Sequence, residues 1–206
     1  MRWLRYFSSV TAPAHAGAMD QDVALGEADY EDLAAHYVKL EKAAVAGDLN
    51  AQYLFAEINE NWKAGYHNYT KTMHWYKKAA LNGHVLAQNR LGYMHRWRVF
   101  VDTDFHEAIK WYTMAARQGH VESMNSLGHM YDHAEDFYEP MDYVPAYMWF
   151  TIAIEYGSKT AARNRDRITK YMKPAQVRAA QGQTKAWLQQ YKTAQATTEP
   201  PATQLD

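Results

Sequence analysis

Two histidines and several carboxylates lie close enough in the sequence to suggest metal chemistry. His129 and His133 are four residues apart, so their side chains share one face if the segment is helical. Asp132, Glu135 and Asp136 are close by. However, no glutamate directly follows the first histidine, as it does in zinc-protease helices. We therefore interpret the segment as a polar helix face, and we expect no metal ion and no cofactor.

The carboxylates Glu57 and Glu60 are the second set of residues that could do chemistry, as a convergent hydrolytic pair. No other catalytic signature accompanies them. The chain has no cysteine, so thiolate nucleophiles and thiolate metal sites are excluded. No serine has the context of a nucleophile elbow, and no glycine-rich phosphate loop is present. We expect a protein that is not an enzyme, with a hydrolase as the open alternative.

The segment Arg96–Arg98 mixes basic and aromatic side chains, a combination that nucleic-acid-binding proteins use. The formal net charge of the whole chain is −1, so there is no general attraction to phosphates. One short patch does not outweigh this balance, and we expect no nucleic-acid partner. The sequence also lacks an apolar run long enough to predict a transmembrane helix.

The elements that must position these residues repeat along the chain. Four glycines recur about 36 residues apart, and each is followed four residues later by a small residue. Tryptophans and alanines share this period. A glycine at that place suits the end of a helix, and the intervening apolar residues follow helical spacing. The glycines are Gly47, Gly83, Gly119 and Gly157; the tryptophans are Trp75, Trp111 and Trp149.

The periodicity predicts an all-α solenoid of stacked antiparallel helix pairs, in which each pair covers the apolar face of the next. Residues 1–19 are expected to be a disordered leader or a weak signal peptide, and residues 193–206 a disordered tail. The repeat domain spans residues 20–192. Its predicted helices lie near 20–27, 29–46, 49–62, 69–82, 85–98, 104–118, 121–134, 142–156, 158–172 and 174–192. His84 and His120, which follow repeat glycines, are expected to begin helices rather than bind a ligand.

These repeats resemble the Sel1-like repeat family of the tetratricopeptide-like superfamily, in its bacterial form, and the resemblance implies that the solenoid is a right-handed superhelix. The resemblance rests on positions such as Leu91, Gly92, Trp111, Leu127 and Gly128 and covers about residues 20–192. It implies a scaffold or adaptor that binds a protein or peptide, because bacterial members serve in envelope assembly, signalling and host interaction. The chain departs from the family where paired glycines are expected between the helices of a pair: the sequence has Arg98 and Phe100 in one repeat, and Trp62 and Ala64 in the preceding one.

The resemblance also implies a concave groove lined by the first helix of each pair. Its polar and aromatic candidates change from acidic near the N-terminus to basic near the C-terminus, which could orient a bound peptide. The candidate residues are Tyr53, Glu57, Asn89, Tyr93, Arg96, Trp97, Asn125, His129, His133, Arg163 and Arg167.

Two alternatives to an adaptor remain at this stage. Some secreted relatives of the family are linked to cell-wall or β-lactam chemistry, but they are rich in cysteine, which this chain lacks. The chain could instead be a structural subunit of an envelope assembly. A monomer is favoured over an oligomer, and a cytoplasmic location over a periplasmic or secreted one, although neither follows from a specific motif.

Overall fold

The computed structural model describes residues 27–60, 69–132 and 142–198, and every secondary-structure element within them is a helix. The predicted leader, most of the predicted helix near 20–27, and the positions of Trp62, Ala64 and His133 lie outside these residues. The chain divides into two compact units, Met1–Arg90 and Leu91–Asp206. None of the described helices is long and apolar enough to cross a lipid bilayer.

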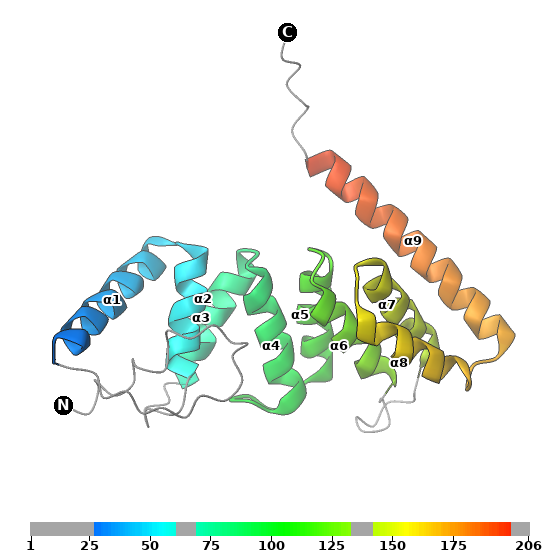
Figure 1. The fold of residues 1–206 in the computed structure, drawn as a ribbon, viewed down its shortest axis with the longest axis horizontal. Helices are drawn as coiled ribbons and strands as arrows, with labels where there is room; N and C mark the ends of the chain where they lie inside the picture. Colours follow the sequence, from blue (N-terminus) through cyan, green and yellow to red (C-terminus); the bar gives the residue numbers. More distant parts are fainter. Residues whose placement is uncertain (1–26, 61–68, 133–141, 199–206) are drawn as a thin grey trace, which may run out of the picture. The chain divides into compact units, whose positions relative to one another are not determined.

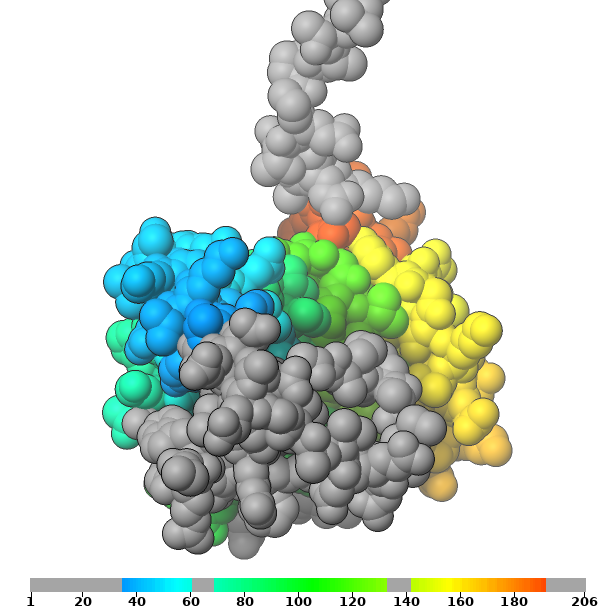
Figure 2. Space-filling view, turned by 60° about the vertical axis from the view of Figure 1, so that its left-hand side comes forward, coloured from blue at the N-terminus to red at the C-terminus, as the bar shows by residue number. Residues whose placement is uncertain are grey.

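Unit 1 contains α1 (Glu27–Ala46), α2 (Leu49–Glu60), α3 (Tyr69–Leu81) and the first part of α4 (Val85–Trp97). Helix α2 packs against both α1 and α3 (Figure 1). The core of this unit is aromatic: Phe55 is fully buried and meets Trp75 edge-on, with ring centroids 5.6 Å apart. Small residues such as Ala79 and Ala80 let the helices approach each other around these rings. In the space-filling view, the coloured part of α1 lies directly against α2 (blue to cyan, Figure 2).

Unit 2 contains the rest of α4, α5 (Phe105–Ala116), α6 (Val121–Asp132), α7 (Tyr143–Glu155), α8 (Lys159–Thr169) and α9 (Pro174–Thr198). Helix α7 is central, because it packs against α6, α8 and α9. It is apolar around most of its circumference and buries Trp149 and Phe150. Helix α9 begins at the predicted Pro174 but continues beyond the predicted end at residue 192 (Figure 1).

All four described junctions between successive helix pairs have the same structure. A glycine with positive φ ends the preceding helix, and the next residue accepts a hydrogen bond from the backbone N–H three residues later. That N–H belongs in each case to the small residue of the repeat. The four capping residues are Asp48, His84, His120 and Ser158, which accept from Ala51, Ala87, Ser123 and Ala161. The prediction that His84 and His120 begin helices is therefore confirmed.

The loop after α4 shows the consequence of the missing family glycines. Arg98 and Phe100 both adopt positive φ, 57° and 65°. This left-handed conformation costs an ordinary L-residue roughly 1–2 kcal/mol relative to the right-handed region. The loop thus keeps a glycine-type backbone without its glycines, and it carries local strain.

Candidate functional site

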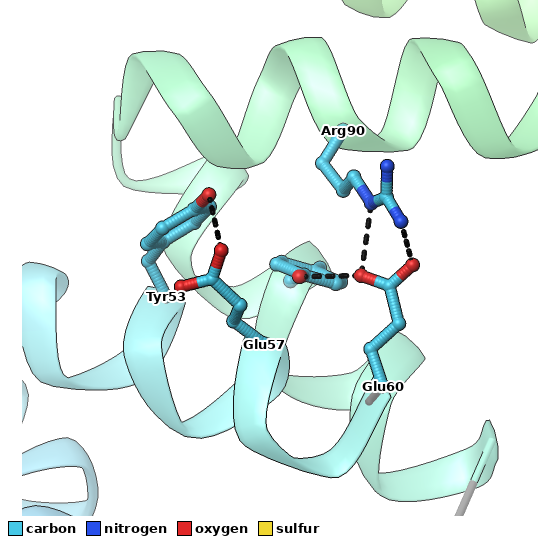
Figure 3. A network of polar contacts seen from close by, with 5 residues as sticks. Tyr53, Glu57, Glu60 and Arg90 are labelled. Atoms are coloured by element: carbon cyan, nitrogen blue, oxygen red, sulfur yellow. Dashed lines mark hydrogen bonds and ion pairs between the residues drawn. The ribbon is translucent and has the colours of Figure 1, made fainter. Parts of the chain in front are cut away.

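A polar network joins α2 to its neighbours in unit 1 (Figure 3). Both carboxylate oxygens of Glu60 are held: Arg90 forms an ion pair with them, its Nε donating to Oε2 at 2.8 Å. The Tyr76 hydroxyl donates to the same Oε2 at 2.7 Å. Glu60 is largely buried, so these partners compensate the desolvation of its charge. Glu60 therefore serves first as a cross-link between helices.

Glu57, one turn earlier on α2, has a different environment. Glu57 is an exposed residue whose carboxylate is only partly desolvated, and it accepts a long hydrogen bond of 3.4 Å from the Tyr53 hydroxyl. Partial burial raises the pKa of Glu57, and burial together with the Glu57 charge raises the pKa of Tyr53 to about 12. The Tyr53 ring also stacks on His84, with centroids 4.7 Å apart. The predicted groove residues of α2 are thus partly occupied by contacts within their own unit.

In unit 2, several predicted groove residues bridge α6 and α8. The Asn125 amide donates to the Thr160 hydroxyl at 2.8 Å, and the Asn164 amide nitrogen lies 3.1 Å from Nε2 of His129. At the end of α6, the buried carboxylate of Asp132 forms an ion pair with Arg167. These three pairs form one ladder between the first helices of successive repeats. Asn125, His129 and Arg167, which were predicted to line the groove, thus also connect α6 to α8, and a groove role would have to be compatible with these contacts.

The C-terminal part of α4 presents the clearest exposed aromatic surface among the predicted residues. Trp97 is 55% exposed and Tyr93 39% exposed, and their ring centroids lie 6.5 Å apart. The guanidinium of Arg96 lies over the Trp97 ring, 4.8 Å from its centroid. We call these three residues the α4 aromatic cluster. Large aromatic side chains kept at the surface, with an arginine beside them, are the residue types that dominate protein interfaces.

The remaining predicted residues are less distinctive or lie elsewhere. Asn89 is half-buried on α4, Arg163 is exposed on α8, and His133 lies outside the described residues. His84 and His120 are helix caps, and burial lowers the pKa of each. Within residues 27–60, 69–132 and 142–198, no three His, Cys, Asp or Glu side chains gather as a metal site would require.

Sequence reasoning missed the partners across the repeats. Arg90, Thr160 and Asn164 were not among the predicted site residues, although they hold Glu60, Asn125 and His129. A usable signal was present, because these partners lie about one repeat further along the chain. Complementary residues at that separation are candidates for contacts between equivalent helices.

Comparison with known proteins agrees with this architecture. The Sel1 repeat model matches residues 64–84, 85–120 and 121–158. A Sel1 repeat protein from Oxalobacter formigenes is 26% identical, with a TM-score of 0.55, over 64% of this chain and 98% of that one. A protective antigen of uropathogenic Escherichia coli with an SLR fold is 22% identical, with a TM-score of 0.63, over 86% of this chain. The chain spans only 37% of that antigen's length. None of the curated proteins matches the chain.

Proposed function

Because the chain belongs to the Sel1 repeat family, whose repeats typically mediate protein interactions, we propose that it is a non-catalytic scaffold that binds a protein or peptide. The α4 aromatic cluster carries this proposal. Tyr93 and Trp97 expose apolar area that water solvates poorly, and burying it against a partner would be favourable. The cluster lies on the first helix of its repeat, the helix that lines the groove expected for the family.

The environment of the carboxylates also favours a binding role over hydrolysis. A hydrolytic pair needs one carboxyl group that reaches the substrate and a second that stays accessible. Glu60 is instead engaged through both oxygens by Arg90 and Tyr76. Its geometry is explained by holding α2 against α3 and α4 within unit 1.

The test compares a double variant of the full chain with a control variant that carries a single substitution. Replacing Tyr93 and Trp97 by serine should abolish most of the partner capture seen with the wild type in cross-linking and affinity capture. Replacing Leu81, which is 71% exposed on α3, by serine is the matched control for loss of exposed apolar area, and it should leave capture intact. Circular dichroism should show unchanged helicity for both. Equal capture by the aromatic variant and the wild type would remove the cluster as the binding surface.

A further inference from the structure

Helix α8 carries an excess of positive charge that the rest of unit 2 only partly neutralises. Its cations are Lys159, Arg163, Arg165 and Arg167, and Asp166 is its single acidic residue. Lys170 follows directly as the C-terminal capping residue. The fold described so far uses only part of this charge, since Arg167 pairs with the buried Asp132 of α6.

Two of these cations are neutralised within the protein. Arg165 donates two hydrogen bonds to Asp166, the shorter at 3.0 Å, and Arg167 pairs with the buried Asp132. Lys159, Arg163 and Lys170 remain exposed and form no ion pair with any residue that the structure describes. Among the described residues, the positive charge of these three side chains is therefore not neutralised by an ion pair.

The three uncompensated cations share one face of the helix. Lys159 and Arg163 are four residues apart, and Lys170 follows seven residues later, two turns along. The neighbouring face is occupied, since Thr160, Asn164 and Arg167 contact α6. The cations thus border the ladder between α6 and α8 without contributing to it. Residues of this part of the chain, in yellow, lie at the molecular surface (Figure 2).

An exposed aromatic residue ends this row. Tyr171 is 67% exposed, and one face of its ring lies near Tyr143, with centroids 6.1 Å apart and planes 22° from parallel. We call Lys159, Arg163, Lys170 and Tyr171 the α8 stripe. It combines a line of cations with one apolar contact at its end.

We propose that the α8 stripe binds an extended acidic segment of the protein partner. Side chains four residues apart on a helix are separated by roughly 6 Å along its axis. In an extended peptide, side chains on one face recur at a similar interval of roughly 6.6 Å. Lys159 and Arg163 therefore match two acidic residues that alternate with another residue in the partner. An apolar residue further along the partner would contact Tyr171. This inference rests on the proposed scaffold function, and it specifies the chemistry of the partner.

The same observations favour an acidic peptide over a nucleic acid. Nucleic-acid binders track a phosphate backbone with many cations and stack bases on open aromatic faces. Here the uncompensated cations form one short row on a chain of net charge −1, and Tyr143 already covers one face of Tyr171. An acidic side chain needs only one or two cations and no free ring face.

The experiment uses the full chain and a fluorescent short peptide in which glutamate alternates with glycine and a leucine ends the sequence. Fluorescence anisotropy should show saturable binding that weakens as the salt concentration rises, because exposed charges are screened. A peptide with glutamine in place of glutamate should not bind. The double variant Arg163→Glu, Lys170→Glu should bind the acidic peptide about tenfold more weakly. The double variant Lys42→Glu, Lys77→Glu, at exposed lysines of α1 and α3, makes the same change in net charge and should bind like the wild type.

Each outcome decides the inference. Equal affinity of the double variant and the wild type, with helicity unchanged, overturns it. Stripe-dependent binding of single-stranded DNA or anionic vesicles in preference to the acidic peptide overturns the assignment to a protein partner. If partner capture requires Tyr93 and Trp97 but the acidic peptide does not bind, the proposed scaffold function is supported and the inference about the α8 stripe is wrong. If the peptide binds through the α8 stripe but partner capture does not depend on Tyr93 and Trp97, the stripe is supported and the α4 aromatic cluster is excluded as the basis of the proposed function.

Discussion

Gly128 on α6 lies directly against the aromatic ring of Phe150 on α7: a Cβ atom added to the glycine would come within 2.5 Å of the ring. The equivalent Gly92 on α4 has the same relationship with Tyr112 on α5, at 2.7 Å. The glycine of each Leu-Gly pair is therefore needed for close helix approach and not for backbone freedom. The large ring facing each glycine fills the space that the missing side chain leaves.

Replacing Gly128 by alanine should destabilise the protein. The alanine favours the helix by about 0.5–1 kcal/mol, but displacing a packed ring costs about 1–3 kcal/mol. The net loss should lower the midpoint of urea unfolding. Gly182→Ala on α9 is the matched control, because its Cβ would meet no atom within 4 Å, and it should raise the midpoint. A Gly128→Ala variant as stable as Gly182→Ala would show that the ring moves away at little cost.

Protonation of the capping histidines should weaken the fold. His84 and His120 accept hydrogen bonds at Nδ1, which a protonated ring cannot do, and a positive charge at a helix N-terminus opposes the helix dipole. Burial lowers the pKa of both residues in the folded state. The folded protein thus binds these protons less tightly than the unfolded chain, so their contribution is complete above about pH 6.5 and declines as pH falls.

The double variant His84→Ser, His120→Ser isolates this effect, because serine already caps the equivalent position at Ser158. Urea unfolding at about pH 7.5 and at about pH 5 should show a smaller loss of stability for the variant than for the wild type. Identical losses would mean that other groups, including the carboxylates, account for the acid sensitivity.

The repeat period of about 36 residues predicted the helices well, because the recurring residues reflect packing that every repeat must satisfy. Trp75, Trp111 and Trp149 are all buried, as their period indicated, and the glycines that end helices all have positive φ. The all-α fold was predictable from these positions, and the family resemblance from these together with the pairs Leu91-Gly92 and Leu127-Gly128.

The partners of the polar residues were not predictable in the same way. Asn125 was predicted to face a peptide, but its amide donates to Ser158 and Thr160. Helical periodicity tells which side of a helix a residue occupies, but the distance between neighbouring helices decides whether a side chain reaches protein or solvent. The family resemblance indicated which face of each helix lines the groove, but it did not indicate how far apart the neighbouring helices lie.

Replacing Arg98 by glycine should stabilise the protein. Its positive φ is strained, and its ion pair with Asp102 is long, at 3.8 Å, and highly exposed, so that pair contributes little. Arg98→Gly should raise the free energy of unfolding by about 1 kcal/mol. Arg98→Ala removes the same side chain but keeps the strain, so it should give no such gain. Thermal unfolding of the two variants side by side measures the difference, and equal melting temperatures would place the strain elsewhere in the loop.

Removing the partners of the largely buried Glu60 carboxylate should show how much they contribute to the stability of the fold. Tyr76→Phe deletes a hydrogen bond to a largely buried carboxylate and should cost about 1.5–3 kcal/mol of unfolding free energy. Arg90→Gln removes the ion pair and should be destabilising as well. Because both act on one carboxylate, the double variant should lose less than the two single losses combined.

Tyr53→Phe is the matched control for the Glu60 network. It removes a hydroxyl of the same kind from the neighbouring Glu57, which is exposed and bound at only 3.4 Å. We expect a loss below about 0.5 kcal/mol, since solvent replaces the bond. Urea unfolding of the four variants gives all the free energies needed. A Tyr53→Phe loss as large as that of Tyr76→Phe would show that burial of the carboxylate does not set the strength of these contacts.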